Sequence, residues 1–149
     1  MTSKKTSDAN QNTSGPDATT ASRTVVSLQI PVGTQSPSEA VTQPHVREAN
    51  GTAKLNAAVA NRGFSLVLPG FSEDIYDELL MTFSTSDNSA GIVSTLIPFV
   101  SGKDSIDIVT PEEISGRFRA GDRAKIKCFL RVTHDIWVEG KDSIEYEIV

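Results

Sequence analysis

The clearest secondary-structure signal in this chain is the stretch DRAKIKCFLRVT, residues 122–133. Its alternate positions carry apolar side chains: Ala124, Ile126, Cys128, Leu130 and Val132. The positions between them are charged or polar, except Phe129. A period of two residues is typical of a strand with one buried face. That face has to pack against another sheet or a helix. Because the apolar runs before and after the stretch are mostly strand-like as well, we predict an all-β fold with a sandwich arrangement.

Shorter strand-like segments flank the stretch on both sides. We expect strands near residues 53–57, 64–68, 79–83, 92–100, 104–109 and 144–148. Pro98 confines its strand to a sheet edge, and Thr110-Pro111 predicts a short helical turn. About seven short strands between residue 44 and the end match an immunoglobulin-like antiparallel β-sandwich in size and spacing.

The first 43 residues differ from the rest. No aromatic residue precedes Phe64, and residues 1–23 are almost wholly small or polar. Such a segment buries too little apolar surface to fold, so we predict a largely disordered tail over residues 1–43 and a domain over 44–149. Inside the tail, residues 24–32 form a strand-like island, the N-terminal apolar segment. Its alternate apolar residues, Val26, Leu28, Ile30 and Val32, are candidate partner contacts.

Charge and hydropathy disfavour several classes of partner. Fourteen Lys and Arg against nineteen Asp and Glu give a net charge of −5, which is unfavourable for non-specific binding to nucleic acid or to an anionic membrane. The N-terminus lacks the apolar core of a signal peptide, and no apolar run reaches membrane-spanning length. We therefore expect no membrane insertion and, by default, a cytoplasmic location.

The polar face of residues 122–133 carries a basic stripe: Arg123, Lys125, Lys127 and Arg131, with Phe129 among them. Cations beside an aromatic ring suit single-stranded nucleic acid. However, Glu145 and Glu147 fall on the same face if the last strand pairs with this one, and opposite charges across strands stabilise a sheet. We expect the stripe to be neutralised.

Other candidate sites are weaker. The acidic cluster Glu73, Asp74, Asp77 and Glu78 offers carboxylates to calcium but lacks the ligand spacing of a calcium loop. His45 and His134 belong to no metal-ligand or nucleophile motif. We predict no enzyme activity and no cofactor.

The segment Ile136-Trp137-Val138 is the one apolar stretch in an expected connection, residues 134–141. An exposed tip would contact a protein or a sugar, whereas a buried one would cap the end of the sandwich. The lone cysteine, Cys128, lies in the apolar row of its strand and is expected to be a buried, inert thiol.

Three segments carry a family resemblance: PHVREANG (44–51), GFSLVLPGF (63–71) and DELLMTF (77–83). With the closing alternation, they resemble the bacterial immunoglobulin-like domains repeated in large proteins of pseudomonads and their relatives. The resemblance implies a structural or adhesive module with an exposed or secreted location, and it implies no catalytic residues.

These observations favour a non-enzymatic interaction module that binds a protein partner or itself. The N-terminal apolar segment is able to add a strand to an open sheet edge, in its own chain or in a neighbour; the competing interpretation is a chance apolar cluster. The alternative function is a carbohydrate- or small-ligand-binding sandwich that uses loops near Trp137 and Glu73–Glu78.

Overall fold

The computed structural model of the chain describes residues 30, 32–33, 36–132 and 136–149. The predicted disorder of residues 1–23, the candidate contacts Val26 and Leu28, and His134 fall outside these residues. The described part is built mainly of strands, with one short α-helix. The all-β prediction is therefore confirmed.

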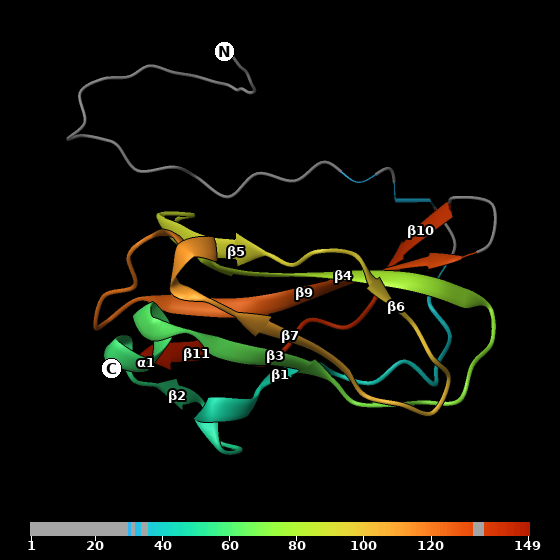
Figure 1. Cartoon of the computed structure of the whole chain (residues 1–149), viewed down its shortest axis with the longest axis horizontal. Helices are drawn as coiled ribbons and strands as arrows, with labels where there is room; N and C mark the ends of the chain where they lie inside the picture. Colours follow the sequence, from blue (N-terminus) through green and yellow to red (C-terminus); the bar gives the residue numbers. More distant parts are fainter. Residues whose placement is uncertain (1–29, 31, 34–35, 133–135) are drawn as a thin grey trace, which may run out of the picture.

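The strands form two sheets that lie one above the other (Figure 1). The smaller sheet has the order β1 (His45–Val46), β3 (Phe64–Leu68), β7 (Ser105–Val109). The larger sheet has the order β2 (Lys54–Leu55), β11 (Tyr146–Ile148), β9 (Arg123–Val132), β4 (Tyr76–Thr85), β5 (Ala90–Val93), β8 (Ser115–Gly116). In addition, β10 (Ile136–Glu139) pairs with β9, and β6 (Ile97–Pro98) pairs with β4. The pairing of β11 with β2 is parallel, and the other strand pairs are antiparallel.

The predicted central strand is confirmed as β9. It pairs along its length with β4, and its even-numbered residues are buried, with Cys128 fully inaccessible. On β4, the core face is formed by Leu79, Met81 and Phe83, as the alternation predicted. These two ten-residue strands provide the larger sheet with its inner surface.

The core lies between the two sheets. Phe64 of β3 packs edge to face on Phe83 of β4, with ring centroids 5.1 Å apart. The Tyr146 hydroxyl of β11 accepts a hydrogen bond of 3.0 Å from the backbone N–H of Val46 in β1. Hydrophobic packing and this buried hydrogen bond therefore both connect the layers.

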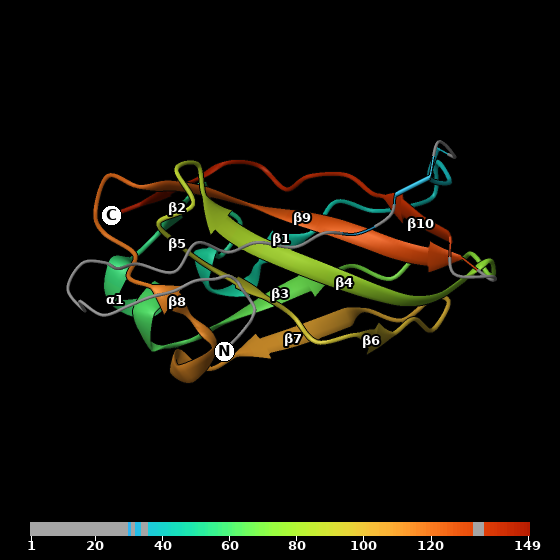
Figure 2. The same ribbon diagram turned by 90° about the horizontal axis from the view of Figure 1, so that it is seen from above.

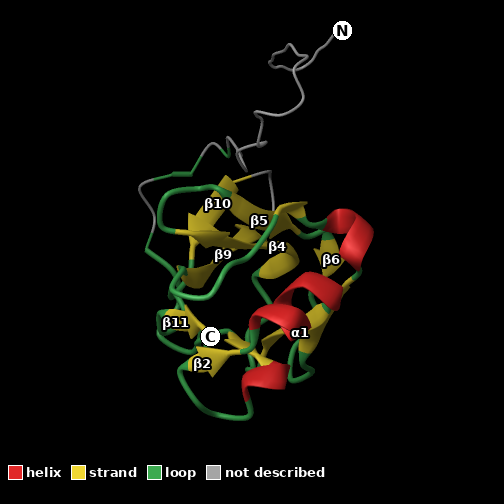
Figure 3. Ribbon diagram, turned by 90° about the vertical axis from the view of Figure 1, so that its left-hand side faces the viewer, coloured by secondary structure: helices red, strands yellow, loops and turns green. Residues whose placement is uncertain are grey.

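One end of the core is covered by α1 (Ala57–Arg62), which lies beside the C-terminus (Figure 3). The sequence predicted a strand over 53–57, but pairing stops at Leu55. The Asn56 side chain accepts hydrogen bonds from the N–H groups of Ala58 and Val59, which caps the helix. The two 3₁₀ turns are η1 (Arg47–Ala49) and η2 (Pro111–Glu113), the latter where Thr110-Pro111 predicted a helical opening.

The packed part of the chain begins before Pro44, where the sequence placed the domain boundary. Val41 is 1% exposed and belongs to the core. The N–H of Ser38 donates to the Tyr76 hydroxyl at 2.8 Å, and the Thr42 hydroxyl donates to the Pro69 carbonyl at 2.5 Å. Composition did not reveal this, because the segment is polar apart from Val41 and is attached partly through hydrogen bonds of Ser38 and Thr42.

Candidate interaction surfaces

The basic stripe on β9 is paired with acidic side chains. Arg123 lies 3.6 Å from Glu145, and Lys125 and Lys127 lie 3.1 and 3.2 Å from the same oxygen of Asp142. The predicted neutralisation is present, although Asp142 was not foreseen. Glu147 lies directly opposite Arg123 in the register of β11 with β9, on the predicted face, and also forms an ion pair of 3.1 Å with Lys54 of β2.

Lys127 shows the electrostatic consequence of this pairing. Burial by itself lowers its pKa, but hydrogen bonds and charge from Asp142 and Glu139 outweigh burial, so the pKa is raised. The carboxylates of Asp142 and Glu139 favour the charged form of the ammonium and also take up its hydrogen bonds. A phosphate group would have to displace these carboxylates.

The acidic cluster is likewise engaged within the fold. Asp77 and Glu78 lie in β4 rather than in a loop, and each carboxylate lies 2.9 Å from the guanidinium of Arg131. The hydrogen bond from Arg131 lowers the pKa of Asp77. Glu73 accepts a hydrogen bond from the Ser38 hydroxyl at 2.9 Å. Across the described ranges, no group of three or more His, Cys, Asp or Glu side chains is placed to hold a metal ion.

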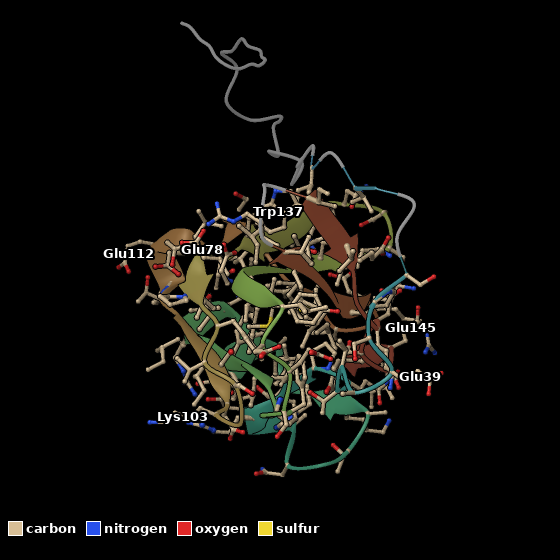
Figure 4. The ribbon with its side chains drawn as sticks, turned by 90° about the vertical axis from the view of Figure 1, so that its right-hand side faces the viewer. Glu39, Glu78, Lys103, Glu112, Trp137 and Glu145 are labelled. Carbon is tan, nitrogen blue, oxygen red and sulfur yellow. The ribbon has the colours of Figure 1, made fainter. Side chains whose placement is uncertain are left out.

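The Ile136-Trp137-Val138 segment lies in β10, a strand paired with the end of β9. The sequence placed residues 134–141 in a connection, and this was wrong for residues 136–139, which form a strand paired antiparallel with β9. Val138 is fully buried and offers no contact surface, Trp137 is half-buried, and Ile136 is 43% exposed. Trp137 lies near the upper margin of the ribbon in Figure 4, and a neighbouring chain segment bridges to it.

That neighbouring segment is the end of the N-terminal apolar segment. Val32 forms a parallel β-bridge with Trp137, and the N–H of Gly33 donates to the Trp137 carbonyl at 3.0 Å. Val32 is 42% exposed and Ile30 is half-buried. The last residue of the segment therefore pairs with a sheet edge of its own chain.

A second sheet edge, β7, was not singled out by the sequence. Ile106 and Ile108 are 38% and 69% exposed, whereas Ser105 and Val109 are buried. Between them Asp107 points inward, and its Oδ2 is buried without a hydrogen-bond partner in the described structure. Burial, reinforced by the charge of Glu113, raises the pKa of Asp107. The strand was visible in the sequence, but its position at an edge depends on the order of the sheet.

No protein-family model matches the chain, and comparisons with curated proteins and with solved structures gave no significant match. Within the described residues, no helix is long and apolar enough to cross a membrane.

Proposed function

We propose that the chain is a non-enzymatic immunoglobulin-like module that self-associates through the edges of its sheets. The strand order supports the immunoglobulin-like part. A small antiparallel sheet, β1-β3-β7, faces a larger sheet in which β5, β4, β9 and β11 are neighbours. Variable-type immunoglobulin domains pair a sheet of this kind with a second sheet that is extended beyond three strands.

Surface chemistry supports the interaction part. The charged side chains of β9 are paired with acids of the same fold, while β7 presents Ile106 and Ile108 to solvent. Most proteins protect such edges, because an open edge with apolar side chains is a template for another strand. The observation that carries the proposal is this apolar outer face on an edge strand.

The test is the mass of the full chain in solution, measured by sedimentation over a wide range of concentration. A mass that rises with concentration is the expected result. A constant monomeric mass, together with a rise in melting temperature on addition of one of a panel of saccharides, would instead favour a carbohydrate-binding sandwich. A constant monomeric mass without that rise would still contradict self-association.

A further inference from the structure

We propose that the open edge of β7 binds residues 24–30 of a second copy of this chain as an added strand. This inference rests on the proposed function. It names residues 24–30 as the donor, the strand that is added, and β7 as the acceptor, the edge that receives it. Three observations on β7 point to such a ligand, and a fourth, on β10, places the donor in another molecule.

The first observation is that β7 has a free side. In the part of the chain that the structure describes, β7 pairs with β3 alone. It forms the rim of the smaller sheet, nearest the viewer in Figure 1 and at the lower margin in Figure 2. The free side of an edge strand carries unpaired N–H and C=O groups at alternate residues. An extended segment that pairs there satisfies them.

The second observation is the outer face of β7. Ile106 and Ile108 stand two residues apart on that face. Val26, Leu28 and Ile30 have the same spacing. A strand added beside β7 with these residues outward would place them next to the two isoleucines, as cross-strand apolar pairs. The donor, with seven residues, is long enough to span the five residues of β7.

The third observation is the inward face. Asp107 lies opposite Leu66 in the register of β7 with β3, and its Oδ2 has no hydrogen-bond partner in the described structure. The inward positions of the donor include Ser27 and Gln29, whose hydroxyl and amide groups are hydrogen-bond donors. Residues 24–32 contain no charge, so no carboxylate of the donor would face Asp107. In the donor, the apolar residues would therefore meet the outer face of β7, and the polar residues between them would meet its inward face.

The bridge at Trp137 shows why the donor belongs to another copy. Val32 is fixed on β10, which pairs with β9 in the larger sheet. Ile30 can lie at most about 7 Å from Val32, whereas packed sheets are about 10 Å apart. In addition, β10 and β7 lie on opposite sides of the molecule in Figure 2. Ile30, the last residue of the donor, therefore cannot lie along its own β7 while Val32 keeps its bridge.

Donor and acceptor are different surfaces of one chain, so each copy can give a strand and receive one. Such a contact is heterologous, and it generates head-to-tail assemblies that are rings or open filaments. An isologous dimer would not behave in this way. This difference makes a mixing experiment decisive.

The experiment uses two full-length variants. Leu28→Lys disables the donor and leaves β7 intact, while Ile108→Lys disables the acceptor and leaves the donor intact. The controls are Ala21→Lys, which lies in the tail before the donor, and Ile144→Lys, which is 44% exposed on the larger sheet side. All four changes add the same charge. Melting temperatures show that each variant is folded.

Sedimentation should find each disabled variant monomeric at concentrations where the unmodified chain and both controls associate. An equimolar mixture of Leu28→Lys and Ile108→Lys should form a one-to-one dimer, because one intact donor and one intact acceptor remain. As a second measurement, a synthetic peptide of residues 24–32 should dissociate the unmodified chain, and the same peptide with Leu28→Lys should not.

The outcomes separate the two proposals. Association that persists in both disabled variants, or a mixture that stays monomeric, would overturn the β7 assignment and leave self-association standing. An unmodified chain that never associates would overturn the proposed function itself. If the peptide also failed to bind that monomeric chain, measured by its fluorescence anisotropy, the β7 assignment would be refuted independently.

Discussion

Replacing Tyr146 with Phe should destabilise the fold by breaking a hydrogen bond between the two sheets. The Tyr146 hydroxyl accepts the N–H of Val46 at 3.0 Å, and these residues are only 2% and 1% exposed. The Phe ring keeps the packing but leaves a buried donor without an acceptor, which costs about 1–3 kcal/mol. We expect the free energy of unfolding to fall by about 2 kcal/mol. This is a large loss, because domains are stable by only about 5–15 kcal/mol.

Urea denaturation followed by far-UV circular dichroism measures this loss, and Tyr76→Phe is the matched control. The Tyr76 hydroxyl accepts the N–H of Ser38 at 2.8 Å, but Ser38 is half-buried, so water can replace the lost acceptor. The control should cost about 0.5 kcal/mol, the lower end for a hydrogen bond. Equal losses in the two variants, or no loss in Tyr146→Phe, would refute the argument that the Val46–Tyr146 bond is buried between the layers.

Three further predictions follow from the electrostatics. Burial raises the pKa of the Cys128 thiol to about 12, so a thiol reagent should label the chain only as fast as it unfolds; rapid native labelling would contradict the burial. Asp142→Asn removes ion pairs of 3.1 and 3.2 Å to Lys125 and Lys127, each worth about 0.2–1 kcal/mol at a partly exposed site. It should lower stability by about 1 kcal/mol and increase retention on a heparin column, and unchanged retention would count against neutralisation. The pKa of Asp107 is raised above its usual 3.8, so the folded state holds this proton more tightly than the unfolded state and loses stability as pH rises from 3.8 through the folded value. Asp107→Asn should therefore be the more stable chain at pH 7 and should lose that advantage below pH 3.8, as measured by urea denaturation; a variant less stable than the unmodified chain at pH 7 would contradict the sign.

The central strands could be predicted because their signal is local. Each even residue of β9 from Ala124 to Val132 is buried, and the sequence displays that period directly. The same holds for Leu79, Met81 and Phe83 in β4. In both strands one face meets the other sheet, and the opposite face carries mostly charged or small polar side chains, apart from the cross-strand pair Leu80 and Phe129. A period of two then identifies the strand and its buried face together.

The phase of β7 could not be predicted from its sequence. In SIDIV, residues 105–109, the two isoleucines look like the buried row, yet Ile108 is 69% exposed. The register with β3 sets Val109 opposite Phe64 and turns Ile106 and Ile108 away from the core. Alternation gives the period of a strand, while a partner strand decides which row is inside. Ile144 differs for another reason: it precedes β11, outside the regular strand, and is 44% exposed although its spacing continues the row of Tyr146 and Ile148.

The basic stripe is paired partly with Asp142, which lies in the connection between β10 and β11. The sequence gives no sign of where this connection runs. Between β10 and β11 the chain stays attached to β9: the N–H of Gly140 donates to the Cys128 carbonyl at 2.8 Å, and the N–H of Ser143 donates to the Ile126 carbonyl at 2.9 Å. The Ser143 hydroxyl also accepts the N–H of Ile126 at 2.7 Å. These bonds hold Asp142 against the stripe. Pairing of the last strand with β9 predicts Glu145 as a partner of the stripe, but it does not predict Asp142, which lies in the connection.

The treatment of the sheet edges explains why an inward carboxylate belongs on β7. The outer side of β9 is covered in turn by β10, the Gly140–Ser143 connection and β11, and β2 pairs beyond β11. On β7 the chain instead places Asp107 on the inward face. Inward charges at a sheet edge discourage pairing with other strands, because an arriving apolar strand would bury the charge without a partner. A strand that brings a hydroxyl or amide group to the same position avoids that penalty. Asp107 therefore selects among incoming strands, and the alternation of Ser27 and Gln29 with Val26, Leu28 and Ile30 meets its requirement.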